Sequence, residues 1–254
     1  MSRSERLLQT EEPRWLLEQW TKRIPEPKNK LEKAEEYDRF AEASFAESDK
    51  AFARELSLII PHGANVVDIG SGPAAQDIEL AMLRPDLHLL LLDYNPDMLE
   101  LAQEKAEDGK ILDQFSFIET DMTKLKDLHL PQNPYVFSNT AFHELRRASQ
   151  LKQTFAGLAH VVGEKGSCYI RDLLRPKDEK QAEEWRAQVL GETGDDSMSS
   201  RQLELFRNSQ RAGFSIEEVK TAIDATSLID RGGTLTHPEA PNSRYWIYEI
   251  KPAV

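Results

Sequence analysis

The stretch 65–81 constrains the fold of this chain more than any other part of the sequence. It begins with a short apolar, largely β-branched run at 66–69, which is typical of a buried strand. Gly70 and Gly72 follow at once, where the missing Cβ lets the backbone turn sharply and approach a ligand. Apolar residues at helical spacing then predict a helix over 74–83. A strand, a glycine turn and a helix in this order present backbone N–H groups to a nucleotide or a carboxylate.

A second apolar run ends in an acid at the distance that a nucleotide-binding unit requires. The run covers residues 87–93 and ends at Asp93. In nucleotide-binding α/β units, an acid about 20 residues beyond the glycine turn accepts hydrogen bonds from ribose hydroxyls. Asp93 lies at this distance from Gly72. Alternatively, Asp93 only caps the helix that is predicted from Pro96. We expect the ribose contact.

Two cofactors compete for this unit. Gly70, Gly72 and Ala75 satisfy the loose dinucleotide pattern, which allows alanine as the third residue. Read from Asp68 to Ala74, however, the stretch resembles the first motif of class I S-adenosylmethionine-dependent methyltransferases, in which an acid precedes the glycines. The third glycine of that motif is Ala74 here. This is a mild departure that narrows the turn without forbidding it.

Three later segments resemble further motifs of the same family, in the same order. The segment 93–99 resembles the second motif, an acid followed by a helix that opens with Pro-Asp-Met-Leu. The segment 118–121 resembles the acidic end of the third strand, which faces the adenine, and 135–145 resembles the fourth strand and its loop. The resemblance runs from about residue 35 to the C-terminus. It favours S-adenosylmethionine over a nicotinamide cofactor.

The resemblance implies a cofactor site that collects residues from all these segments. We expect it to contain Tyr37, Asp68, Gly70, Gly72, Asp93, Tyr94, Asp121, Met122 and Asn139. Tyr37 belongs to a helical segment predicted over 30–60, and the resemblance places its ring near the sulfonium, which an aromatic face attracts. Two alternatives stay open at this point. Tyr37 could be a core residue, and Asp121 could only cap the end of its strand.

The order of the predicted elements indicates an α/β fold. Strands near 65–70, 87–93, 115–119, 134–138, 167–172 and 244–250 alternate with helices near 74–83, 96–107, 149–162 and 215–225. Such alternation predicts a mostly parallel, Rossmann-like sheet with helices on both faces. The resemblance implies seven strands, with a final antiparallel strand inserted between the fifth and the sixth. We expect an N-terminal helical extension at 1–49, a catalytic domain at 50–254, and a helical insertion at 177–213.

Candidate catalytic and acceptor-binding residues follow the fourth and fifth strands. His143 lies in the loop after 134–138, and a histidine near its ordinary pKa could take a proton from a hydroxyl acceptor. A structural role for His143 is the alternative. Arg171 and Arg175 end the fifth strand, where ligands bind in open α/β sheets. A planar guanidinium there could hold an anionic acceptor, or both arginines could form surface ion pairs.

Charge and cysteine content narrow the partners. The net charge of −12 argues against a general nucleic-acid or anionic-membrane binder, which needs a basic face. The segment 138–142 also lacks the Pro-Pro of enzymes that methylate base amino groups. The single cysteine, Cys168, fits a reducing cytosol and is expected in the core. We find no leader-like start, no run long enough to span a bilayer and no metal-ligand cluster, so we expect a cytoplasmic protein without a metal.

These features together predict an S-adenosylmethionine-dependent methyltransferase that acts on a small molecule. An NAD(P)-dependent oxidoreductase and a non-catalytic cofactor-binding or regulatory subunit remain the alternatives. An amphipathic helix is predicted over 1–24, interrupted at Pro13. It could pack on the domain, form a homodimer interface or act as a substrate lid.

Overall fold

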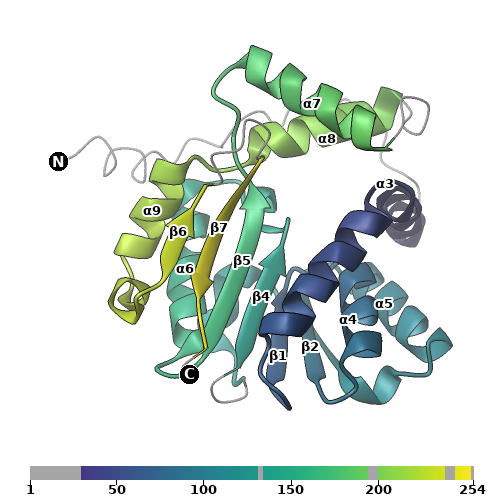
Figure 1. Ribbon diagram of the computed structural model, residues 1–254, viewed down its shortest axis with the longest axis vertical. Coiled ribbons are helices and arrows are strands. Elements are labelled where there is room, and N and C mark those ends of the chain that lie inside the picture. The colour runs from purple at the N-terminus through teal and green to yellow at the C-terminus, as the bar shows by residue number, and fades with distance from the viewer. Residues whose placement is uncertain (1–29, 131–133, 194–199, 238–243, 253–254) are drawn as a thin grey trace.

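The computed structural model describes residues 30–130, 134–193, 200–237 and 244–252, so the helix predicted over 1–24 lies outside the described residues. These residues form a seven-stranded sheet with helices on both faces (Figure 1). The strand order is β3-β2-β1-β4-β5-β7-β6. The strands β1 to β5 pair in parallel, and β7 is antiparallel to both β5 and β6. This confirms the predicted α/β fold, including the antiparallel strand between the fifth and the sixth.

The elements follow one another in the predicted order. The strands are β1 (Asn65–Ile69), β2 (His88–Asp93), β3 (Phe115–Glu119), β4 (Tyr135–Asn139), β5 (Ser167–Leu173), β6 (Thr234–Thr236) and β7 (Tyr245–Ile250). The α-helices are α3 (Lys30–Ile59), α4 (Ala75–Leu83), α5 (Pro96–Asp108), α6 (Ala148–Val162), α7 (Glu179–Thr193), α8 (Ser200–Ala212) and α9 (Ile216–Asp224). Short 3-10 helices are η1 (Leu112–Gln114), η2 (Met122–Asp127), η3 (Phe142–Glu144) and η4 (Ser227–Arg231).

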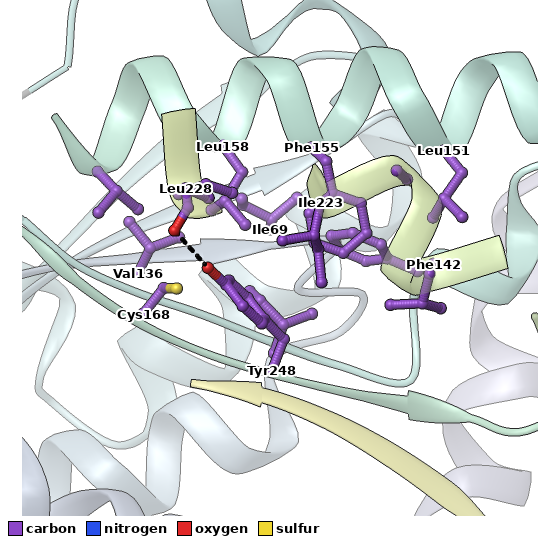
Figure 2. Packing of buried hydrophobic residues seen from close by; sticks show 14 of the residues in the cluster. Ile69, Val136, Phe142, Leu151, Phe155, Leu158, Cys168, Ile223, Leu228 and Tyr248 are labelled. Carbon is purple, nitrogen blue, oxygen red and sulfur yellow. Dashed lines mark hydrogen bonds between the residues drawn. The ribbon is translucent and has the colours of Figure 1, made fainter. Parts of the chain in front are cut away.

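Each face of the sheet carries its own apolar core. On one face, side chains of the sheet pack against α6 and α9, with Phe142, Phe155 and Tyr248 among the large buried groups (Figure 2). The Tyr248 hydroxyl donates a hydrogen bond of 3.2 Å to the carbonyl oxygen of Leu228. A buried tyrosine hydroxyl needs such a partner in an apolar setting. The other face packs against α3, α4 and α5. Cys168 lies in the first core, as predicted.

The alternation of side chains along each strand decides which core a polar residue faces. Tyr169 belongs to the core under α3, so Arg171, two residues later on β5, points to the same face. Ile170 belongs to the opposite core, and Asp172 points that way. The same rule places Asp68 and Asn139 on the face of α3 and α4. At the carboxyl edge, where β1 to β5 end, polar side chains therefore point to both faces of the sheet.

Helix α3 is the longest element and crosses the predicted domain boundary. It runs unbroken from Lys30 to Ile59, so the expected division at 49/50 falls inside one helix. Phe52, Ala53 and Leu56 are buried against the sheet and its neighbouring helices. Nearer its start, Asp38 forms an ion pair with Lys105 of α5. Both halves of α3 therefore contact the rest of the domain.

The predicted insertion corresponds to α7 and α8, which lie across the carboxyl edge in Figure 1. Val189 of α7 and Phe206 of α8 form a small buried cluster, against which Phe45 of α3 packs. These two helices and the first half of α3 therefore surround the end of the sheet where the predicted site residues gather.

The last part of the chain differs from the prediction at one strand. Residues 227–231, to which the sequence pattern assigned no element, form η4, and β6 spans only 234–236. So short a strand cannot show an alternating pattern, and only pairing with β7 defines it. In the described part of the chain, we find no helix that is both long and apolar enough to cross a membrane.

Candidate functional site

The glycine turn between β1 and α4 lies at the carboxyl edge and is closely covered. Gly70 and Gly72 have φ of +77° and +54°, and Ala74, in the place of the third glycine, has φ of +59°. A Cβ added to Gly70 would lie 2.4 Å from the Cβ of Ala141 and 3.5 Å from the Cε of Met122. The turn therefore touches both the loop after β4 and the predicted cofactor residue Met122.

The N–H groups of this turn already have partners. Gly70 and Ser71 donate to the carbonyl oxygen of Leu92, at 2.7 and 3.1 Å. Gly72 donates to Oδ2 of Asp93, at 2.8 Å. The sequence predicted N–H groups open to a ligand, but here they join β1 to β2. A dinucleotide pyrophosphate needs such donors, whereas S-adenosylmethionine has no phosphate, so this pairing fits the methyl donor better.

Asp93 ends β2 beside the glycine turn, where the sequence placed it. Its carboxylate is almost completely buried, and Oδ1 accepts a second hydrogen bond from the N–H of Asn95, at 2.9 Å. Burial raises the pKa of Asp93, and the backbone donors oppose this shift. The capping role belongs to Asn95, whose Oδ1 accepts from the N–H of Asp97 at the start of α5. Asp93 is therefore not the cap of that helix. Tyr94, the next residue, is largely exposed.

Asp121 and Tyr37 border the same region. Oδ1 of Asp121 accepts from the N–H and the hydroxyl of Thr123, both at 2.8 Å, so Asp121 caps η2, while its Oδ2 takes no part in the cap. Half of the Tyr37 surface is exposed. Burial of its hydroxyl nevertheless raises the Tyr37 pKa, and the carboxylates of Glu144 and Asp49 add to this. Glu144 belongs to η3, so the hydroxyl of Tyr37, a residue of α3, lies near η3.

Two acids, Asp68 and Asp77, form a buried carboxyl pair between β1 and α4. Neither is exposed to solvent. The amide of Gln76 donates to Oδ2 of Asp68, at 3.3 Å. Burial, followed by the neighbouring Asp77 carboxyl, raises the pKa of Asp68 well above its ordinary range, and burial raises the pKa of Asp77 to about 7. The sequence did not single out Asp77, because an acid in the first turn of a helix is common.

We expect the Asp77→Asn variant to be more stable than the wild type above neutral pH. The pKa of Asp77 is raised to about 7 in the folded protein. The folded state therefore binds more protons than the unfolded chain between about pH 4 and 7, and stability falls as pH rises. One pKa unit corresponds to about 1.4 kcal/mol. Because Asp68 and Asp77 share the cost of burying their carboxyl groups, we expect the variant to gain about 2 kcal/mol in the free energy of unfolding at pH 8. Urea denaturation at pH 8 and near pH 4 measures this. An equal gain at both pH values would contradict the assignment.

Asn139 connects the buried pair to β5. Its Nδ2 donates to Oε1 of Gln76 at 2.7 Å, and its Oδ1 accepts from Nε of Arg171 at 2.9 Å. The guanidinium of Arg171 lies 4.1 Å from the centre of the Phe52 ring of α3. A polar chain thus runs from Asp68 through Gln76 and Asn139 to Arg171, along the α3 side of the carboxyl edge.

The second predicted arginine, Arg175, has a different environment. Its Nη2 lies 2.8 Å from Oε2 of Glu218, and its Nε donates to the carbonyl oxygen of Gly213 at 3.0 Å. Glu218 is buried and completes a capping box with Ser215 at the start of α9, which is the box that the sequence predicted. The structure therefore brings Arg171, but not Arg175, to the predicted cofactor residues.

His143 lies on η3, on the opposite side of the edge from Arg171. It is buried, and its Nδ1 lies 3.0 Å from Oδ1 of Asp172, at the end of β5. Asp172 is itself buried and accepts from the N–H groups of Phe142 and Leu173, at 2.5 and 2.6 Å. An anionic partner at Nδ1 favours the tautomer with the proton on Nδ1, which makes Nε2 the basic nitrogen. Nε2 lies 3.5 Å from a carboxylate oxygen of Glu144.

The family of this chain is identified by its similarity to a known protein domain. A profile described as "Methyltransferase domain" matches residues 60–214, which is more than half of the chain. The chain belongs to the methyltransferase domain family. The methyl donor of this family is S-adenosylmethionine. The match confirms the predicted methyltransferase family and its cofactor, and the nicotinamide alternative finds no support.

This methyltransferase domain is similar to several named methyltransferases. The release factor glutamine methyltransferase of Aquifex aeolicus is 31% identical over 127 residues, which cover 47% of this chain and 43% of the relative. The chain spans less than half the length of the curated relatives it matches.

Two solved structures share the fold of this methyltransferase domain. An O-methyltransferase family protein from Burkholderia thailandensis gives a TM-score of 0.63 at 12% identity, over 98% of this chain and 67% of that one. An O-methyltransferase family 2 protein from Planctomyces limnophilus gives 0.56 at 16% identity, over 89% and 62%.

Proposed function

We propose that the protein transfers a methyl group from S-adenosylmethionine to a hydroxyl group of a small organic acceptor, with His143 as the general base. The observation that carries this proposal is the pair of His143 and Asp172 beside the glycine turn. Ala141, two residues before His143, occupies the space next to Gly70. The base is therefore held next to the turn on which the methyl donor is expected to bind.

The cofactor residues are assigned from their places at the carboxyl edge. Asp93 ends β2 and would bind the ribose hydroxyls, with the tyrosines Tyr37 and Tyr94 alongside. Asp121 follows the third strand and would accept from the adenine amino group through the oxygen that does not cap η2. Met122, which lies against Gly70, would pack on the adenosine. When bound, the cofactor supplies an activated methyl group on a sulfonium, a good leaving group.

The chain itself has to align the acceptor and remove one proton. Alignment of the acceptor oxygen with the methyl carbon supplies a large part of the acceleration. Nε2 of His143 would take the hydroxyl proton of the acceptor, whose oxygen would receive the methyl group that the bound cofactor supplies. Asp172 then stabilises the imidazolium, because its carboxylate holds the Nδ1 proton. The products are a methyl ether and S-adenosylhomocysteine, and the proton leaves His143 afterwards.

A small acceptor fits the surroundings of His143 better than a macromolecule. Helices α7 and α8 lie across the carboxyl edge of the sheet (Figure 1), and α8 packs on β5 and on η3, which carries His143. The net charge of −12 disfavours RNA. The Planctomyces protein that shares the fold was crystallised in complex with apigenin. These points support the acceptor class, while its identity requires a direct assay.

The test follows the fate of a labelled methyl group. The purified protein is incubated with S-adenosylmethionine that carries a carbon-13 methyl group and with a bacterial extract separated into small molecules, RNA and protein. We expect label in the small-molecule fraction, with the carbon chemical shift of an O-methyl group. Label that is found only in RNA or protein, or on nitrogen or sulfur, would overturn the proposal.

A further inference from the structure

Arg171 is held in a fixed position with part of its guanidinium unused. Its Nε donates to Asn139, and its guanidinium carbon lies 4.1 Å from the ring centre of Phe52 and 5.1 Å from that of Tyr245. No described residue accepts a hydrogen bond from its two terminal nitrogens. A stacked guanidinium with free terminal donors is prepared to bind a planar anion such as a carboxylate through two hydrogen bonds.

An acid of opposite charge lies close by on α3. Asp49 precedes Phe52 by three residues, so the two side chains share one side of the helix. The charge of Arg171 acts on Asp49: burial raises the Asp49 pKa to about 6, and Arg171 and then Lys105 oppose this shift. Arg171 and Asp49 form no ion pair among the described residues. A cation and an anion therefore face the same region without neutralising each other.

The strand order shows which part of the cofactor reaches them. β1 lies between β2 and β4 in the sheet, so with the ribose at Asp93 the methionine half would extend across β1 toward β4. Two strand spacings are about 10 Å. The end of the methionine half would then lie near β4, where Asn139 contacts Arg171. This end carries a carboxylate and an ammonium group.

We propose that Arg171 and Asp49 recognise the amino-acid end of the methyl donor: Arg171 binds the α-carboxylate and Asp49 binds the α-ammonium. Arg171 would thus bind the methyl donor, whereas the sequence suggested that it binds an anionic acceptor. The proposal rests on the family's cofactor and on the ribose contact of Asp93. It does not depend on the acceptor or on His143.

Three ligands separate the two contacts in calorimetric titrations. S-adenosylhomocysteine carries both groups, its decarboxylated analogue S-adenosyl-3-thiopropylamine carries only the ammonium, and methylthioadenosine carries neither. We expect Arg171→Met to weaken the first ligand by about 10- to 100-fold and to leave the other two unchanged. We expect Asp49→Asn to weaken the first two by about 10-fold and to leave methylthioadenosine unchanged.

Control variants make the result specific. Lys152→Met removes one positive charge from an exposed position on α6 and should change none of the three affinities. Arg171→Lys keeps the charge but loses the planar fork, so it should lose part of the affinity for S-adenosylhomocysteine even if Arg171→Met fails to fold. Equal losses for all three ligands, or no loss for S-adenosylhomocysteine, would overturn the proposal. If the wild type bound methylthioadenosine and S-adenosylhomocysteine equally well, the proposal would fail while the methyl-transfer proposal would stand.

Discussion

The His143→Ala variant is expected to lower kcat by about 100- to 10,000-fold, which is the usual contribution of a general base. The affinity for S-adenosylhomocysteine should stay near that of the wild type, because His143 is assigned to the acceptor and not to the donor. The measurement combines kcat with the acceptor identified by the labelling assay and calorimetry with S-adenosylhomocysteine. Equal losses of both quantities would indicate that His143 only supports the loop.

The Asp172→Asn variant tests whether Asp172 is needed to orient His143 and to set its tautomer. An amide at this position can still hydrogen-bond Nδ1, but it favours the tautomer that places the proton on Nε2. We therefore expect a large fall in kcat with the fold retained. Circular dichroism and thermal denaturation check that the fold is retained. A kcat that is unchanged by the substitution would argue against His143 as the base.

The Gly70→Ala variant is expected to lower the free energy of unfolding by about 3 kcal/mol, from a backbone cost and an overpacking cost together. The φ of Gly70 is +77°, and a Cβ there would meet the Cβ of Ala141 at 2.4 Å. The left-handed backbone costs an alanine about 1–2 kcal/mol. The overpacking adds a similar amount. Gly72→Ala is the matched control, because a Cβ at Gly72 has no atom within 4 Å. That variant should lose only about 1 kcal/mol, since it carries the backbone cost alone.

Thermal or urea denaturation of three variants tests this explanation. The double variant Gly70→Ala, Ala141→Gly removes the opposing methyl group and should recover part of the lost stability. If Gly70→Ala and Gly72→Ala were equally unstable, the contact between the turn and the loop after β4 would not contribute. Such a result would also weaken the inference that His143 lies next to the glycine turn.

The order of elements and the family motifs could be predicted because local pattern determines them. The apolar run at 66–69, the glycines and the acid at 93 each depend on residues close in sequence. The short β6 could not be predicted, since it has only three residues and is defined by its pairing with β7. The cap of α5 also escaped prediction. Asp93 and Asn95 both suit a cap, and only the contact of Asp93 with Gly72 separates their roles.

The sequence proposed candidate residues for the site but not the contacts between them. His143 follows β4 and Asp172 lies on β5, so their contact depends on these strands being neighbours in the sheet. Asp49 gave no signal, because one more acid on a highly charged helix is not distinctive. Asp77 was missed for a similar reason, although its side chain is fully buried. Relations across the sheet require the three-dimensional arrangement, which one sequence does not provide.

The unbroken course of α3 has a consequence for how the two substrates influence each other. Phe45 packs against α7 and α8, and Phe52, further along the same helix, stacks on Arg171. The rise of an α-helix separates these two positions by about 10 Å along its axis. A continuous helix between these contacts cannot shift at one without moving the other. Under the proposal for Arg171, donor binding and the packing of α7 and α8 act on the same helix, and any coupling between them is reciprocal.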